Sequence, residues 1–230
     1  MRQDIVGSGR GSMRHAPIHD SGSASLGRSK TERPVQTHGE GAAAAESHTA
    51  TTDAMFRSRL MSYVRAVNDQ AVPLTGCGER YEDLLDYVLS SVPGCRVQRN
   101  TLNHYRTEEV DLTIANDRLC NGLRMLPELF LVECKNWSVP VDSTTIGYFV
   151  NVIADRGCSL GILAAAKGIT GRPEHRSRAY AIGAAALVRG LRLLVITQDD
   201  IMRLNSPMDV VTLLHHRNHS LTAHGTIHLG

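Results

Sequence analysis

Two charged side chains, Glu133 and Lys135, interrupt the otherwise apolar run 130–135. Side chains alternate across a strand, so residues two apart share a face and lie about 6.6 Å from each other. Packing gives a strand no reason to hold a carboxylate and an ammonium together. Only three of the 25 basic residues are lysines, which suggests a role that arginine fills poorly. A compact ammonium can orient a water or lose a proton, whereas a guanidinium stays charged. We therefore predict that the pair marks an active site.

Two further carboxylates are expected near this pair. Asp111 lies on a predicted strand, on the face opposite the apolar residues, and Glu82 lies beside the apolar stripe of a predicted helix. Magnesium prefers hard oxygen ligands and commonly takes one or two protein carboxylates together with water and substrate phosphate oxygens. A metal ion of this kind can polarise a phosphoryl oxygen and supply an activated water, which a lysine can orient. The set predicts metal-dependent cleavage of phosphodiester bonds.

Alternating helices and strands are expected to position these residues. The alternation of the later elements favours parallel pairing in an α/β sandwich. A short extra strand within 119–126 would make Asp117 a competitor of Asp111. The periodicity of the apolar residues predicts helices at 54–70, 78–92, 143–157 and 174–189, and strands at 96–99, 110–114, 129–135, 160–166 and 192–197.

Composition divides the chain into four parts. Residues 1–52 contain no aromatic residue and are rich in Gly, Ser, Ala, Thr and His. Such a segment buries too little apolar surface to offset the entropy lost on ordering, so we predict a disordered tail. We expect a flanking helix within 53–77, a catalytic domain at 78–205 and a second, His-rich tail at 206–230.

The location of the protein is predicted from cysteines and hydropathy. The five cysteines show no CxxC spacing, which is typical of a reducing compartment. No apolar stretch approaches the about 20 residues that span a bilayer, and the N-terminus lacks the apolar core of a secretory signal. We expect a cytoplasmic protein with no membrane association.

The motifs resemble the Mrr-like restriction endonucleases of the PD-(D/E)xK nuclease superfamily. The resemblance runs from about Gly78 to Leu204, and it implies a restriction-endonuclease-like three-layer sandwich with a central mixed sheet flanked by helices. Val110 stands where the first motif of the superfamily often has proline. The matching pieces are Gly78-x-x-Tyr81-Glu82, Val110-Asp111, Val132-Glu133-Cys134-Lys135-Asn136-Trp137, Gly161-Ile162-Leu163, Gly168-Ile169-Thr170, Arg178-Ala179-Tyr180-Ala181 and Leu193-Leu194-Val195-Ile196.

The resemblance also implies a role for each site residue. Asp111 and Glu133 would be metal ligands, helped by the backbone carbonyl of Cys134. Glu82 would bind the metal directly or through water, and Lys135 would position the attacking water. The expected metal is magnesium, for which manganese can substitute.

Basic residues gather after the central motif, where Glu174 is the single acid between Arg156 and Arg192. Such an excess suits phosphate backbones, although a solvated helix face would show the same pattern. The residues predicted to contact DNA are Lys167, Arg172, Arg176 and Arg178, with Asn136 at the mouth of the site.

The sequence therefore predicts a magnesium-dependent endonuclease that hydrolyses DNA, with restriction of foreign DNA as one pathway open to it. Alternatives are a noncatalytic module of the same fold that binds nucleic acid or protein, a repair or junction-resolving nuclease, and an RNA-cleaving enzyme, because fold does not fix function. Cutting both DNA strands would need two sites, which favours a homodimer, and a separate specificity subunit is the other expected partner.

Overall fold

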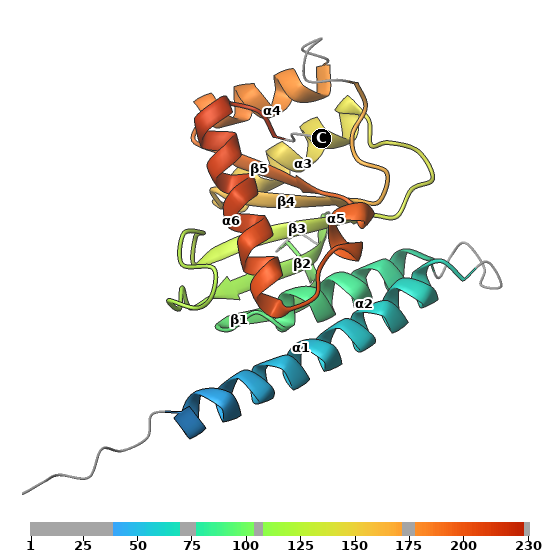
Figure 1. Ribbon diagram of the computed structural model, residues 1–230. Helices are drawn as coiled ribbons and strands as arrows, with labels where there is room; N and C mark the ends of the chain where they lie inside the picture. Colours follow the sequence, from blue (N-terminus) through green and yellow to red (C-terminus); the bar gives the residue numbers. More distant parts are fainter. Residues whose placement is uncertain (1–38, 70–76, 104–107, 172–177, 228–230) are drawn as a thin grey trace, which may run out of the picture. The chain divides into compact units, whose positions relative to one another are not determined.

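A mixed five-stranded sheet forms the centre of the protein (Figure 1). The structure, a computed structural model, describes residues 39–69, 77–103, 108–171 and 178–227, and for residues 39–50 and residue 77 it describes the backbone alone. The strands follow one another across the sheet in chain order; the first three are antiparallel to their neighbours, and the last three run parallel. They are β1 Cys95–Leu102, β2 Glu109–Asn116, β3 Leu129–Lys135, β4 Leu160–Ala165 and β5 Arg192–Ile196.

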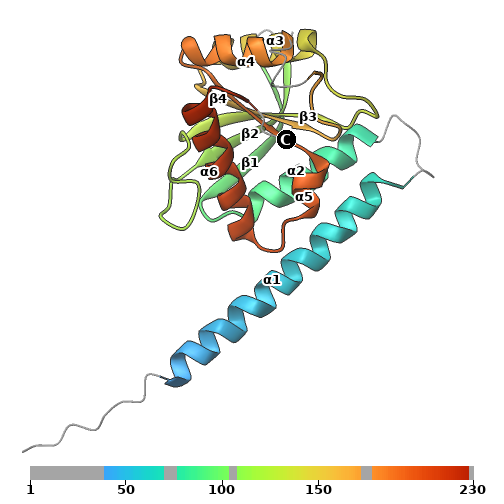
Figure 2. The ribbon, with the colours of Figure 1, turned by 45° about the horizontal axis from the view of Figure 1, so that its top comes forward.

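Helices cover both faces of this sheet. α2 and α6 pack on one face, and α3 and α4 lie together on the other (Figures 1 and 2). Tyr87 of α2 stacks on Phe56 and Tyr63 of α1, with ring centroids 5.6 and 5.0 Å apart. The predicted α/β class, a mixed sheet flanked by helices, is confirmed. The helices are α1 Gly39–Val67, α2 Cys77–Ser90, α3 Ser143–Asp155, α4 Arg178–Val188, α5 Gln198–Met202 and α6 Pro207–His224.

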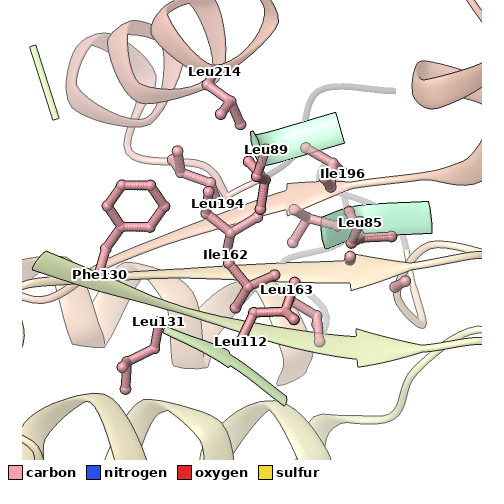
Figure 3. Close-up of a cluster of buried hydrophobic side chains, with 14 of the residues drawn as sticks. Leu85, Leu89, Leu112, Phe130, Leu131, Ile162, Leu163, Leu194, Ile196 and Leu214 are labelled. Carbon is pink, nitrogen blue, oxygen red and sulfur yellow. The ribbon is translucent and has the colours of Figure 1, made fainter. Parts of the chain in front are cut away.

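The core lies on both sides of β4, every residue of which is buried. A strand with parallel neighbours on both sides and helices on both faces is expected to be apolar throughout. Leu89 of α2 and Leu214 of α6 reach the sheet from one face, and Leu131 points to the opposite face (Figure 3). The apolar stripe predicted on the second helix, which includes Tyr81 and Leu85, is fully buried. This two-sided packing fixes the strands that carry the candidate site.

The prediction of a tail at 206–230 is wrong for the segment that forms α6. The helix begins with a capping box between Ser206 and Asp209 and ends at Gly225, whose φ of 66° is in the left-handed region. Leu214 and Leu221 are buried. The signal was weak in the sequence because His, Asn and Arg residues separate the apolar positions.

The first helix also differs from its prediction. α1 begins at Gly39, so residues 39–52 are helical where a disordered tail was expected. Four consecutive alanines at 42–45 have the highest helix propensity of any residue type, which gives a physical reason for the extension. The helix ends at Val67, and the stretch 70–76 lies outside the described residues.

The connection between β2 and β3 forms turns at 120–125, without the extra strand considered for 119–126. Asp117 follows β2 and pairs with Arg96 at 2.6 Å. Because β2 and β3 are antiparallel, with Ala115 opposite Leu129, Asp117 lies at the end of β3 far from Glu133. Asp117 is therefore no competitor of Asp111.

Candidate active site

The antiparallel pairing of β2 and β3 brings Asp111 next to Glu133. Leu112 pairs with Val132, so one step further along each strand sets the two carboxylates opposite each other on one face. Asp111 Oδ2 accepts a hydrogen bond from the backbone N–H of Cys134 at 2.7 Å. This contact fixes the carboxylate against the backbone of the neighbouring strand.

Glu133 and Lys135 form an ion pair on the same face. Lys135 Nζ lies 2.5 Å from Glu133 Oε1, and the two side chains are 20% and 14% exposed, respectively. The contact is the one that strand alternation predicts for residues two apart. Solvent screens this pair less than it would screen a pair on the open surface.

The electrostatics of the pair favour a further positive charge. Burial raises the pKa of Glu133, and the nearby charge of Asp111 raises this pKa further, against the lowering effect of Lys135. The pKa of Lys135 is raised although burial acts to lower it, because the Glu133 and Asp111 carboxylates outweigh burial. Lys135 therefore stays protonated, and its single charge stands against two carboxylates.

A divalent metal ion fits this arrangement. Two adjacent, partly desolvated carboxylates are the usual protein contribution to a magnesium site, which is completed by water and substrate oxygens. In the described part of the chain, no three His, Cys, Asp or Glu side chains form a group that could hold an ion. An ion at Asp111 and Glu133 would therefore need other oxygen ligands as well.

The structure places Glu82 with a different partner. Its Oε2 accepts a hydrogen bond from Nη2 of Arg99 on β1 at 3.1 Å, and Arg99 also contacts Asp83. Glu82 thus pairs with Arg99, although its charge still helps to raise the pKa of Cys134, after burial and the charge of Asp111.

The Cys134 side chain points away from the Glu133 and Lys135 face, as strand alternation requires. Burial raises the pKa of the Cys134 thiol well above its usual value, so the thiol stays protonated and inert. Burial is also the main cause that raises the pKa of the fully buried Tyr81. Only the backbone of Cys134 is available to the site.

The predicted DNA-binding residues have different surroundings. Lys167 and Arg178 are exposed, and Asn136 is half-buried beside Lys135. The backbone N–H of Ala166 donates to the carbonyl of Lys135 at 2.9 Å, which holds the turn with Lys167 beside the end of β3. Arg172 and Arg176 lie outside the described residues.

Two other members of the basic cluster have structural contacts. Arg156 donates to the backbone carbonyls of Thr101 and Glu108 at 3.2 and 3.1 Å. Arg192 donates to Asn218 Oδ1 at 3.0 Å, which ties β5 to α6. Residue type alone could not separate these arginines from those that face solvent.

Sequence reasoning missed two residues beside the carboxylates. Glu108 lies just before β2, and its negative charge contributes to the raised pKa of Glu133. Asn100 lies across from Asp111, between the pairs Arg99–Leu112 and Thr101–Val110, with a φ of 50°. Asn adopts left-handed geometry more readily than most residues, but no pattern in the strand marked this position.

A family model described as a restriction endonuclease, Mrr_cat, matches residues 77–196, more than half of the chain. The chain belongs to this family. The Mrr_cat match begins at the start of α2, ends at the last residue of β5, and contains Asp111, Glu133 and Lys135. It confirms the predicted resemblance, the restriction-endonuclease-like fold and a nuclease domain. No curated protein matches the chain. None of the described helices is long and apolar enough to cross a membrane.

Proposed function

We propose that the protein is a metal-dependent endonuclease that hydrolyses DNA phosphodiester bonds. The observation that carries the proposal is the contact set of Asp111, Glu133 and Lys135 on one face of β2 and β3, inside a segment that matches the restriction endonuclease family. A purely structural ion pair would not need a second carboxylate beside it, since this adds like-charge repulsion in a partly buried place.

Asp111 and Glu133 would hold the metal, with the backbone carbonyl of Cys134 as a third ligand. Magnesium is the proposed ion, and manganese is expected to substitute for it. When bound, such an ion lowers the pKa of a coordinated water and stabilises charge on a phosphoryl oxygen. Glu82, whose Oε2 atom accepts a hydrogen bond from Arg99, is proposed to reach the ion through water.

Lys135 would orient the attacking water and neutralise charge that develops on the phosphate. Its Nζ lies beside the Glu133 carboxylate, where a water held by that carboxylate would be within reach. Because the pKa of Lys135 is raised, the side chain is a hydrogen-bond donor at neutral pH and cannot act as the base. The proton of the water must therefore go to another acceptor, such as solvent or a phosphate oxygen.

Phosphate-backbone contacts are proposed for Lys167, Arg178, Arg172 and Arg176, with Asn136 at the mouth of the site. Such contacts position a protein on DNA without reading its sequence. Restriction of foreign DNA in the cytoplasm is the pathway we propose. Cutting both strands would then require a homodimer, and a separate subunit could supply specificity.

The proposal is tested with supercoiled plasmid, linear duplex, single-stranded DNA and RNA, each incubated with magnesium, manganese or a chelator. We expect nicked or linear plasmid only when metal is present, and no product with Lys135→Met. Cleavage of RNA alone would change the substrate class. A protein that cuts none of the four polymers with either metal would contradict the proposal.

A further inference from the structure

Trp137 is the single tryptophan of the chain, and it follows Lys135 by two residues. Its side chain is 40% exposed, so a large part of the indole is open to solvent. No other aromatic ring stacks on it within the described ranges. One exposed apolar side chain is ordinary on a protein surface, so the position of the indole decides what it can bind.

Backbone hydrogen bonds fix both ends of the segment that carries Trp137. At one end, the carbonyl of Lys135 accepts from the N–H of Ala166 at 2.9 Å. At the other end, the N–H of Val141 donates to the carbonyl of Gly168, also at 2.9 Å. The segment therefore lies beyond the carboxyl ends of the parallel strands β3 and β4, which is where open α/β sheets commonly bind ligands.

An exposed ammonium accompanies the indole. Lys167 lies in the turn between the two residues that hold the Trp137 segment, Ala166 and Gly168, and its side chain is exposed. Proteins that bind single-stranded nucleic acid combine such cations, which contact phosphates, with aromatic rings on which bases stack. The two exposed groups therefore suit one nucleotide, with its phosphate toward the ammonium and its base on the indole.

The distance from the indole to the site is short. Because Trp137 is two residues from Lys135, their Cα atoms are at most about 7 Å apart. A base next to the phosphate that Lys135 serves is therefore within reach of the indole. In a duplex that base is already paired and stacked, and taking it out of the helix costs free energy. An unpaired base carries no such cost.

We infer that Trp137 stacks on an unpaired base beside the attacked phosphate, so that the protein prefers DNA with an unpaired base at the cut, such as a single strand, a gap or an overhang. The inference rests on the proposed function and names its substrate class. Base stacking on an aromatic side chain is worth a factor of about 5–150 in affinity. Since every base has a π-face, this contact should give little sequence preference.

The first test is fluorescence, because the single tryptophan reports on this segment alone. Lys135→Met protein, which should bind DNA without cutting it, is titrated in magnesium with a thymine oligonucleotide, an abasic strand of equal length and a blunt duplex. We expect the thymine strand to quench the indole emission. The abasic strand offers the same phosphates without bases and should leave the emission unchanged, and the duplex should quench it weakly.

The second test is the affinity of variants for a dye-labelled thymine strand, measured by anisotropy in the same Lys135→Met background. Trp137→Leu should weaken binding at least about fivefold, and Trp137→Phe, which keeps an aromatic ring, should recover most of the affinity. Val139→Ala is the control, since Val139 is 59% exposed in the same segment, and it should bind like the Lys135→Met parent. Affinity for the blunt duplex should not change in any variant.

Two results would overturn the inference and leave the proposed function standing, provided that the wild type cuts plasmid with metal. The first is a thymine strand that binds without changing the indole emission. The second is a Trp137→Leu variant that binds the thymine strand like its parent, or that loses the thymine and abasic strands equally. A wild-type protein that cuts no polymer while its indole is quenched by the thymine strand would instead contradict the proposed function and leave the base contact standing.

Discussion

Replacing Leu214 by alanine should destabilise the protein strongly, because α6 is part of the core. Leu214 is 1% exposed and lies near Leu89 and Leu194 (Figure 3). The change removes three buried carbons at about 0.8 kcal/mol each, and the cavity that remains adds a further penalty. A total of about 3–4 kcal/mol is expected, within the range for buried leucines. For a domain of this size, this lowers the midpoint of thermal unfolding by roughly 6–16 °C.

The assay is urea unfolding followed by circular dichroism, with Leu213→Ala as the control. Leu213 is the preceding residue and only half-buried, so its loss should cost about 1–2 kcal/mol. A flexible tail would make both changes harmless. If Leu214→Ala stays within about 0.5 kcal/mol of the wild type, the assignment of α6 to the core is refuted.

Three further predictions concern the site and its supports. Burial and neighbouring charge raise the pKa of Glu133, so this carboxylate takes up a proton at a higher pH than an ordinary glutamate. Only the deprotonated form binds metal, so Mn²⁺ affinity measured by calorimetry should fall as the pH drops through that raised pKa. A fall in affinity centred at or below the pKa of an ordinary glutamate, about 4.3, would contradict this. Gly161→Ala places a Cβ 2.3 Å from Cδ1 of the buried Ile153 and should cost about 1–3 kcal/mol in urea unfolding. Gly147→Ala, with its nearest contact at 3.8 Å, should stabilise α3 by up to about 1 kcal/mol, so equal effects of the two changes would refute the packing argument. Arg156→Gln should cost about 1–3 kcal/mol, because two hairpin carbonyls lose their donor; an unchanged urea midpoint would show that this attachment is unimportant.

The sequence predicted the strands well because buried strand positions carry apolar residues in a regular pattern. β3 has the predicted bounds, and the helix stripe around Leu85 is buried as expected. The contact between Glu133 and Lys135 follows from the alternation of a strand alone. The closeness of Asp111 to Glu133 depends on register, which the apolar faces of β2 and β3 specify.

Side-chain contacts between residues far apart in the sequence could not be predicted. Arg99 lies on β1 and takes Glu82 of α2 as its partner, an encounter that depends on how a helix sits on a strand. In the sequence Arg156 is one of several basic residues. The two backbone carbonyls that it binds belong to residues far from it in the chain. Glu108 gave no signal, since a glutamate at the end of a hairpin is ordinary in sequence.

The central claim is tested most directly by comparing Asp111→Asn and Asp117→Asn in a plasmid cleavage assay with magnesium. Asp111 lies within β2 and Asp117 directly follows it, where Asp117 pairs with the exposed Arg96. Asp111→Asn should reduce the cleavage rate by at least about 100-fold, and Asp117→Asn should leave it within about twofold, since an exposed ion pair contributes little. Cleavage by Asp111→Asn at the wild-type rate would contradict the account.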